Sequence, residues 1–174
     1  IQGMDLASFL RDVPDFPKPG ILFKDISPML ASPEAMQTVT DRFAALDFGS
    51  VDKVAGIESR GFLFGVPLAM QLGVGFIPVR KPGKLPAKTQ SVSYDLEYGS
   101  DSVEMHEDAV AEGERVLVVD DLLATGGTMA AAAQLVEACG GIVAGCASVI
   151  ELAFLQARAN ALAERRCESL IVVG

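Results

Sequence analysis

The chain has 174 residues, which is enough for one domain with a sizeable hydrophobic core. Half of its residues are hydrophobic and 21% are charged, as in a compact soluble protein. The net charge of −9 and the pI near 4.5 argue against a nucleic-acid-binding protein, because that function needs Lys and Arg to neutralise phosphates. Any phosphate that the protein binds must therefore be held by local groups.

Cysteine usage and the longest apolar stretch bear on where the protein works. Cys139, Cys146 and Cys167 are odd in number and lack metal-ligand spacing, which indicates a reduced, cytoplasmic protein. Residues 61–79 carry no charge and are long enough to cross a bilayer, but glycines and prolines interrupt them, so we expect no membrane span. Residues 1–3, ahead of Met4, are interpreted as an expression remnant, and no signal peptide is expected.

The N-terminal region is predicted to contain a helix, a stiff loop, a short strand and a second helix. Apolar residues at helical spacing predict a helix over residues 5–12, and the prolines and glycine of residues 14–20 then prevent regular structure. Residues 21–26 predict a short extended segment, in which Phe23 is interpreted as a core residue. Residues 32–34, Ser-Pro-Glu, combine an N-cap, a proline and an acidic first turn, and predict the start of the second helix.

Residues 53–79 predict a strand-helix-strand unit with a candidate anion site. The expected elements are a core strand over 53–57, a turn over 58–61, a helix over 61–72 and a strand over 74–79. In an open α/β sheet, ligands bind beyond the carboxyl ends of the strands, which is where the turn lies. Arg60 in this turn is therefore a candidate anion clamp.

A basic loop, residues 80–86, follows in this acidic protein. It carries one arginine and two lysines among Pro and Gly, and we interpret it as a mobile cationic flap over an anionic substrate. Residues 91–98 alternate as an exposed hairpin strand does, residues 102–106 are the expected partner strand, and Gly99 marks the turn. Glu97 and Tyr98 therefore belong to the flap region.

Residues 115–129, RVLVVDDLLATGGTM, are the most informative stretch. The apolar run 116–119 predicts a strand buried on both faces of a parallel sheet, which stops at Asp120 and Asp121. Residues 125–128, TGGT, then precede a helix, and their N–H groups and hydroxyls at its N-terminus favour a phosphate. The two carboxylates suit sugar hydroxyls or a hydrated divalent cation, so a ribose 5-phosphate is the obvious ligand.

Ordinary turn chemistry and rival nucleotide motifs account for only parts of this stretch. Asp, Thr and Gly also serve as caps and turn residues at strand-helix junctions, and TGGT alone carries little weight. A P-loop is excluded because GxxxxGK[ST] is absent, and a dinucleotide fingerprint because Pro78 stands where its third glycine would be. Adjacent Asp residues also occur in phosphoacceptor receiver domains, but a receiver domain would not explain the TGGT of residues 125–128. His106, the only histidine, is interpreted as structural, so a nucleophilic triad is not expected.

The C-terminal region is predicted to complete the sheet. The expected elements are a strand over 142–150, a helix over 153–164 and a strand over 169–173. In that helix the inward residues would be Phe154, Ala157, Ala161 and Leu162. Alternating strands and helices predict an α/β fold with a parallel, doubly wound sheet flanked by helices, in a single domain over residues 1–174.

The chain resembles the adenine branch of the type I phosphoribosyltransferases over nearly its whole length. RVLVVDDLLATGGTM matches the superfamily motif for phosphoribosyl pyrophosphate (PRPP), and ESRGFLFG (58–65) and VRKPGKLP (79–86) match further family segments. FPKPGILFKDISP (16–28) and SYDLEYG (93–99) match the adenine branch specifically. The resemblance implies a type I phosphoribosyltransferase fold with a small hood, residues 4–30, and a flexible flap and hairpin, residues 80–106. It also implies transfer of the phosphoribosyl group of PRPP to adenine, giving AMP and pyrophosphate in purine salvage, by a cytoplasmic homodimer with Mg²⁺.

The resemblance also assigns roles to individual residues. Asp120 and Asp121 would bind the ribose hydroxyls and, through PRPP and water, Mg²⁺. Glu97 would transfer a proton at the base, and Arg60 would stabilise the departing pyrophosphate. The remaining PRPP-binding residues would be Ser59, Arg80, Lys81, Lys84, Tyr98, Ala124, Thr125, Gly126, Gly127 and Thr128. The adenine-binding residues would be Leu22, Phe23, Lys24 and Leu122, and stacking on adenine would replace the interpretation of Phe23 as a core residue.

Two residues depart from the family pattern, since Lys24 stands where Arg is common and Glu58 where Asp is common.

Two alternative functions share the PRPP motif. A non-catalytic PRPP-sensing regulator would need a basic surface for nucleic acid, which a charge of −9 does not offer. Orotate, hypoxanthine and uracil enzymes share the DDxxATGGT region but not FPKPGILFKDISP. These observations favour adenine as the base.

Overall fold

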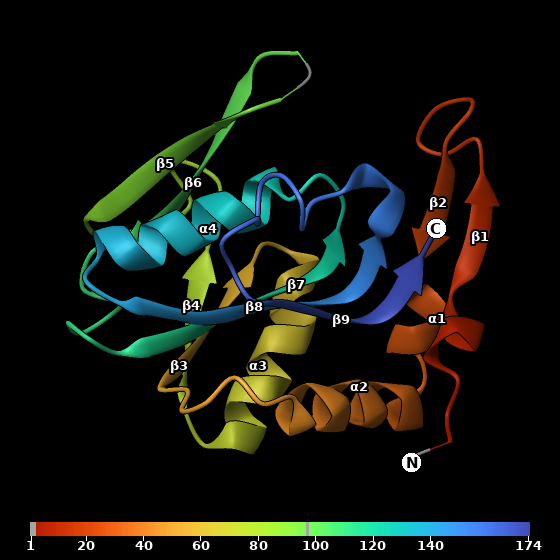
Figure 1. Ribbon diagram of the computed structural model, residues 1–174, viewed down its shortest axis with the longest axis horizontal. Helices are drawn as coiled ribbons and strands as arrows, with labels where there is room; N and C mark the ends of the chain where they lie inside the picture. Colours follow the sequence, from red (N-terminus) through yellow and green to blue (C-terminus); the bar gives the residue numbers. More distant parts are fainter. Residues whose placement is uncertain (1–2, 97) are drawn as a thin grey trace.

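A parallel sheet of five strands lies at the centre of the computed structural model, which describes residues 3–96 and 98–174 (Figure 1). The strand order is β4-β3-β7-β8-β9, and every neighbouring pair is parallel. The strands are β3 (Lys53–Ile57), β4 (Gly75–Val79), β7 (Arg115–Leu123), β8 (Ile142–Leu152) and β9 (Cys167–Val173). The predicted parallel, doubly wound α/β sheet is confirmed.

Helices cover both faces of this sheet. Helices α2 (Pro33–Ala45) and α3 (Arg60–Leu72) pack on one face, and α4 (Gly127–Ala138) packs on the other (Figure 1). In β7, Val116 and Val118 face the α4 side, while Leu117 and Val119 face the α2 and α3 side. All four are at most 1% exposed, which explains why this strand is a continuous apolar run rather than an alternating one. Within the described part of the chain, no helix has the length and apolar character needed to span a membrane.

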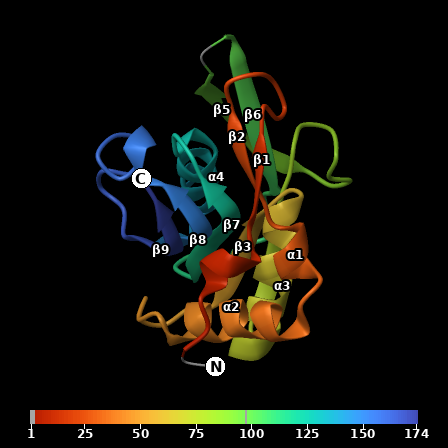
Figure 2. The same ribbon diagram turned by 90° about the vertical axis from the view of Figure 1, so that its right-hand side faces the viewer.

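Two hairpins extend from the sheet on the side to which its strands point (Figures 1 and 2). One pairs β1 (Arg11–Pro14) with β2 (Leu22–Asp25), and the other pairs β5 (Thr89–Asp95) with β6 (Ser100–His106). An isolated bridge between Arg80 and Glu104 joins the basic loop to β6. Both hairpins therefore stand beside the carboxyl ends of the parallel strands, where ligands of this fold class bind.

The N-terminal helix predicted over residues 5–12 is wrong. The chain forms a short 3-10 helix (Leu6–Phe9) and then β1, followed after β2 by a helix that was not predicted, α1 (Ser27–Leu30). Val13 lies opposite Phe23 in the β1–β2 pair, so pairing with β2 decides the conformation of residues 11–14. A helix of eight residues is marginal by itself, and a tertiary partner easily overrides it.

Strand β7 is longer than predicted. It does not stop at Asp120 and Asp121, the Asp pair, but continues to Leu123. Strand β8 runs beside it and pairs Leu122 with Ile150 and Leu123 with Glu151. The two carboxylates therefore lie within a strand, which holds them more rigidly than a loop would.

The helix predicted over residues 153–164 is also wrong. A 3-10 turn (Ala153–Leu155) ends at Gln156, whose φ of 58° is left-handed and stops a right-handed helix. Phe154 is 61% exposed and Ala161 is exposed, contrary to prediction, whereas Ala157 and Leu162 are buried as predicted. The other predicted strands and helices are present, with bounds that differ by a few residues.

Candidate active site

Two adjoining cavities lie at the carboxyl ends of β3 and β7. One, of about 210 Å³, is lined by residues 120–129 and Arg60. The other, of about 410 Å³, is lined by the turn after β3, the Asp pair, Lys81, Val103 and Thr128. A third cavity, of about 550 Å³, lies between α4 and residues 160–165, away from the strand ends. Because Arg60, Asp120, Asp121 and Thr128 line both of the first two cavities, those cavities form one site.

The Asp pair forms the floor of this site. Asp120 Oδ1 accepts a hydrogen bond from the Asp121 N–H at 2.8 Å, and Asp121 Oδ2 accepts one from Arg60 Nε at 2.5 Å. Asp121 is 5% exposed, so the ion pair with Arg60 offsets the hydration that the Asp121 carboxylate loses on burial. Burial, and next the neighbouring Asp121 carboxylate, raise the pKa of Asp120 well above its ordinary value. An approaching cation or hydroxyl donor would relieve this unfavourable concentration of negative charge.

The predicted phosphate loop forms the N-terminus of α4. Gly126 caps this helix with a φ of +91°, a conformation that favours glycine, and a Cβ there would lie 3.0 Å from the Ala157 side chain. Residues 124–128 line the 210 Å³ cavity, and the first backbone N–H groups of a helix have no partner within the helix. Since the helix dipole adds partial positive charge, this loop suits a phosphate.

The turn after β3 connects the Asp pair to the basic loop. The peptide bond between Glu58 and Ser59 is cis. Glu58 Oε1 accepts hydrogen bonds from Arg80 Nε at 3.0 Å and from the Lys81 N–H at 2.8 Å. A Cβ at Gly61 would lie 3.0 Å from Asp120 Oδ1, so glycine allows α3 to approach the acidic pair. The sequence predicted neither the hydrogen bonds of Glu58 nor the steric role of Gly61, because both depend on the close packing of distant segments.

The structure brings one of the three predicted loop cations to the cavity wall. Lys81 lines the 410 Å³ cavity, and its ammonium forms an ion pair with Asp101 of β6. The Arg80 guanidinium lies over the Phe62 ring at 5.9 Å, and Lys84 is exposed. Neither Arg80 nor Lys84 is among the lining residues of the two cavities.

Of the two residues predicted at the flap tip, the structure describes Tyr98. Tyr98 is 86% exposed and does not line either cavity, and Glu97 lies outside the described residues. Their predicted roles stay predictions.

The predicted base-binding residues come from two distant segments. Phe23 on β2 lies under the Arg60 guanidinium, with 5.8 Å from Arg60 Cζ to the ring centroid, and Leu122 lines the 210 Å³ cavity. Leu22 is 55% exposed. Lys24 Nζ is 2.5 Å from Asp12 Oδ1 in the hairpin, so its side chain is engaged away from the cavities. Arg60 therefore links the aromatic ring to the acidic pair.

The donor set suits a magnesium ion only where water or a bound phosphate supplies the remaining ligands. No cluster of three or more His, Cys, Asp or Glu side chains suited to a metal occurs among residues 3–96 and 98–174. Asp120 and Asp121 by themselves offer only carboxylate oxygens, of which Asp121 Oδ2 accepts from Arg60 and Asp120 Oδ1 accepts from the Asp121 N–H. Mg²⁺ commonly binds in this way, through one or two carboxylates, water and substrate phosphates.

Comparison with known proteins gives concordant matches. The family model for the phosphoribosyl transferase domain matches residues 30–169. An adenine phosphoribosyltransferase of Microcystis aeruginosa is 59% identical over 158 residues, which are 89% of this chain and 92% of that protein. The crystal structure of adenine phosphoribosyltransferase from Thermoanaerobacter pseudethanolicus has a TM-score of 0.93 and 54% identity, covering 97% of this chain and 98% of that chain.

A further match includes bound ligands. Adenine phosphoribosyltransferase from Saccharomyces cerevisiae, complexed with adenine and an imino-altritol bisphosphate, has a TM-score of 0.89 and 42% identity, covering 95% of this chain and 96% of that chain. The predicted type I phosphoribosyltransferase fold is therefore confirmed. Because relatives of this similarity match nearly the whole chain in sequence and in structure, the chain belongs to the adenine phosphoribosyltransferase family.

Proposed function

We propose that this protein transfers the phosphoribosyl group of PRPP to adenine, giving AMP and pyrophosphate in purine salvage. The observation that carries the proposal is the single site in which Arg60 joins the Asp pair to Phe23, beside the phosphate loop. PRPP offers a 5-phosphate, a ribose diol and a pyrophosphate, and this site contains a group suited to each. Phe23 adds an apolar face for a purine.

In the proposed mechanism the protein stabilises opposite charges that develop on the ribose and on the leaving group. Departure of pyrophosphate from the anomeric carbon leaves an oxocarbenium-like ribose, as in glycoside chemistry. The carboxylates of Asp120 and Asp121 hold the ribose hydroxyls, and the N–H groups of residues 124–128, with the Thr125 and Thr128 hydroxyls, hold the 5-phosphate. Ser59, Arg60 and Lys81 surround the cavity that would receive the pyrophosphate, so donors meet its growing negative charge. This scheme needs no covalent nucleophile.

Magnesium dependence is part of the proposal. Asp120 and Asp121 would hold Mg²⁺ mainly through water and PRPP, and the raised pKa of Asp120 is consistent with a carboxylate pair that a cation would stabilise. When bound, the ion would neutralise charge on the leaving pyrophosphate.

For the base, the family resemblance suggests that adenine stacks on Phe23 near Leu122. The Leu22 carbonyl would accept from the exocyclic amine, and the Lys24 N–H would donate to the adjacent ring nitrogen. The ion pair between Lys24 and Asp12 supports a main-chain role for Lys24, because its side chain is engaged elsewhere. Glu97 would transfer the proton that adenine must exchange, and Tyr98 would contact the sugar.

We further propose that the protein is a cytoplasmic homodimer. An apolar stripe on α3, formed by Leu63, Val66 and Met70, is 42%, 38% and 76% exposed, and such a stripe is typical of an interface. In the family, some of the loop cations act across the dimer interface, which would give tasks to Arg80 and Lys84. The three cysteines are free thiols, in keeping with a reducing compartment.

The test is formation of AMP from adenine and PRPP, with and without Mg²⁺, together with the ratio of kcat/KM for adenine to that for hypoxanthine. Hypoxanthine would oppose like groups at both main-chain contacts, and sites of this kind reject such analogues by roughly ten-thousandfold or more. A ratio below about a hundredfold, the level that shape alone reaches, would contradict main-chain readout of the base. Absence of AMP formation would contradict the proposed function itself.

A further inference from the structure

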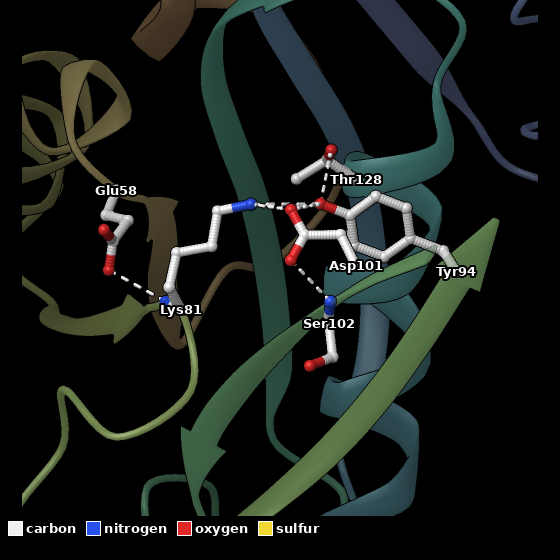
Figure 3. A network of polar contacts seen from close by, with 6 residues as sticks. All are labelled: Glu58, Lys81, Tyr94, Asp101, Ser102 and Thr128. Atoms are coloured by element: carbon white, nitrogen blue, oxygen red, sulfur yellow. Dashed lines mark hydrogen bonds and ion pairs between the residues drawn. The ribbon is translucent and has the colours of Figure 1, made fainter. Parts of the chain in front are cut away.

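Asp101 places a further carboxylate beside a cavity that both cationic and acidic side chains line. The cavity of about 410 Å³ is lined by donors, Ser59, Arg60 and Lys81, and by the carboxylates of Glu58, Asp120 and Asp121. Asp101 of β6 is bound to the Lys81 ammonium (Figure 3). The Lys81 and Asp101 side chains are 42% and 32% exposed, so a ligand can reach the ion pair. Asp121 is paired with Arg60, and Asp101 is paired with Lys81, so the pair with Asp101 reduces the attraction of Lys81 for a polyanion in the cavity.

Asp101 is held in place from its own strand and from the neighbouring one. Its Oδ1 accepts a hydrogen bond from the Ser102 N–H at 2.8 Å. Tyr94 lies directly opposite in the β5–β6 pair, and its hydroxyl is 3.4 Å from Asp101 Oδ2 (Figure 3). The same hydroxyl accepts from Thr128 Oγ1 at 3.2 Å and lies 3.5 Å from Lys81 Nζ. The cross-strand pair of Tyr94 and Asp101 thus engages a hydroxyl of the phosphate loop and the ammonium at the pyrophosphate cavity.

The ion pair removes part of the positive charge that a pyrophosphate would use. An ammonium has three donors, and Asp101 and Tyr94 lie within reach of two of them. The hydrogen bond with Asp101 raises the pKa of Lys81, and the hydrogen bond with Lys81 lowers the pKa of Asp101, so both side chains are charged at neutral pH. A pyrophosphate in the cavity would gain the full charge of Lys81 only by weakening this pair.

We propose that Asp101, supported by Tyr94, competes with pyrophosphate for the Lys81 ammonium and so lowers the affinity of the site for pyrophosphate. This inference rests on the proposed function, because it concerns the leaving group of that reaction. Its consequence is easier release of the product, a step that limits turnover in many enzymes.

The experiment measures binding of inorganic pyrophosphate to the full chain by calorimetry in the presence of Mg²⁺. Asp101→Asn keeps the shape of the side chain and removes its charge, and it should lower the Kd for pyrophosphate by about two- to fivefold, the range expected for a half-exposed ion pair. Asp95→Asn is the matched control, because Asp95 lies next to Tyr94 on the same strand, is exposed, and points to the opposite face of the hairpin. It removes the same charge and should leave the Kd unchanged.

A second pair of variants tests whether Lys81 mediates the effect. Lys81→Met should weaken pyrophosphate binding, and adding Asp101→Asn to it should then produce much less than the gain seen with Lys81 present. If Asp101 merely positioned Lys81, Asp101→Asn would raise the Kd, so either a raised or an unchanged Kd overturns the proposal. Asp101→Ser serves as a second variant should Asp101→Asn fail to fold.

The parent protein separates this inference from the proposed function. If it forms no AMP from adenine and PRPP, the proposed function fails. If it forms AMP but removal of the Asp101 charge does not tighten pyrophosphate binding, only the competition by Asp101 is refuted.

Discussion

Gly61 controls the position of a carboxylate in the active site. A Cβ at this position would lie 3.0 Å from Asp120 Oδ1 and 3.1 Å from the Val119 carbonyl oxygen. The first helical turn of α3 carries Arg60, which must approach Asp121 at the same place. Because Gly61 has no side chain, Asp120, Asp121 and Arg60 can lie close together.

Gly61→Ala should lower kcat/KM by about tenfold to a hundredfold, because a displacement of about 1 Å in a positioned catalytic group has an effect of this size. Gly75→Ala is the control, since a Cβ there would make only an ordinary contact, 3.8 Å from the Lys53 side chain. Steady-state kinetics measures the loss, and circular dichroism checks that the variants fold. Equal activity of the Gly61 variant and the parent would refute the steric argument.

The two residues that depart from the family pattern both have partners in this chain. Lys24 is paired with Asp12 across the β1–β2 hairpin, and Glu58 bonds Arg80 and the Lys81 N–H. Glu58 therefore fixes the start of the basic loop against the turn that carries Ser59 and Arg60. Neither residue touches the phosphate loop in the described contacts.

At the scale of elements, the segment after β8 supports the phosphate loop. Ala157 and Leu162 are buried, and a Cβ at Gly126 would lie 3.0 Å from the Ala157 side chain. Arg158 between them donates to both carboxylate oxygens of Glu151, at 2.8 to 3.0 Å, and also to the Cys167 carbonyl. This ion pair thus holds an irregular segment in place where no helix does so.

The Glu151–Arg158 pair should make stability depend on pH. The hydrogen bond from Arg158 lowers the pKa of Glu151 below its unfolded value of about 4.3. The resulting stabilisation is fully present above that unfolded value and is lost as the pH falls through the folded pKa. Glu151→Gln should lower the free energy of unfolding by about 1–3 kcal/mol at pH 7, yet lose less stability than the parent between pH 5 and pH 3.

Urea unfolding at several pH values measures this difference. Glu168→Gln is the control, because the ion pair of Glu168 with Arg166 is exposed, at 3.7 Å, and such pairs contribute about 0–1 kcal/mol. Parallel pH profiles for Glu151→Gln and the parent would exclude a stabilising role of this ion pair.

For the whole molecule, the proposed homodimer predicts a specific response of the α3 stripe. Met70→Glu should shift the protein from dimer to monomer at micromolar concentration, because a two-fold interface brings the same charge in from both subunits. Val172→Glu is the control, since Val172 is 60% exposed on the edge strand β9, away from α3. Sedimentation velocity measures both. A monomeric parent would refute the proposed homodimer. Equal dissociation of the two variants would refute an interface at the α3 stripe.

Local residue patterns were enough to predict the central strands, the helices α2, α3 and α4, and the strand-loop-helix order around residues 120–128. These features are local: a period of apolar residues defines each element, and the Asp pair and phosphate loop belong to one strand-loop-helix unit. Their functional groups are neighbours in the chain, so their proximity did not depend on how distant segments pack.

The contacts between distant residues depend on tertiary packing, which local residue patterns do not specify. Arg60 and Asp121 are 61 positions apart, and the Lys81–Asp101 pair depends on how the β5–β6 hairpin lies against the loop after β4. The same holds for β1, which became a strand because β2 is its partner, and for the segment after β8, which the Glu151–Arg158 pair holds without a helix. Local periodicity predicts a helix or strand correctly only where the segment's own conformational preference is stronger than the long-range contacts that compete with it. Short segments form few internal hydrogen bonds, so their own preference is too weak to decide their structure.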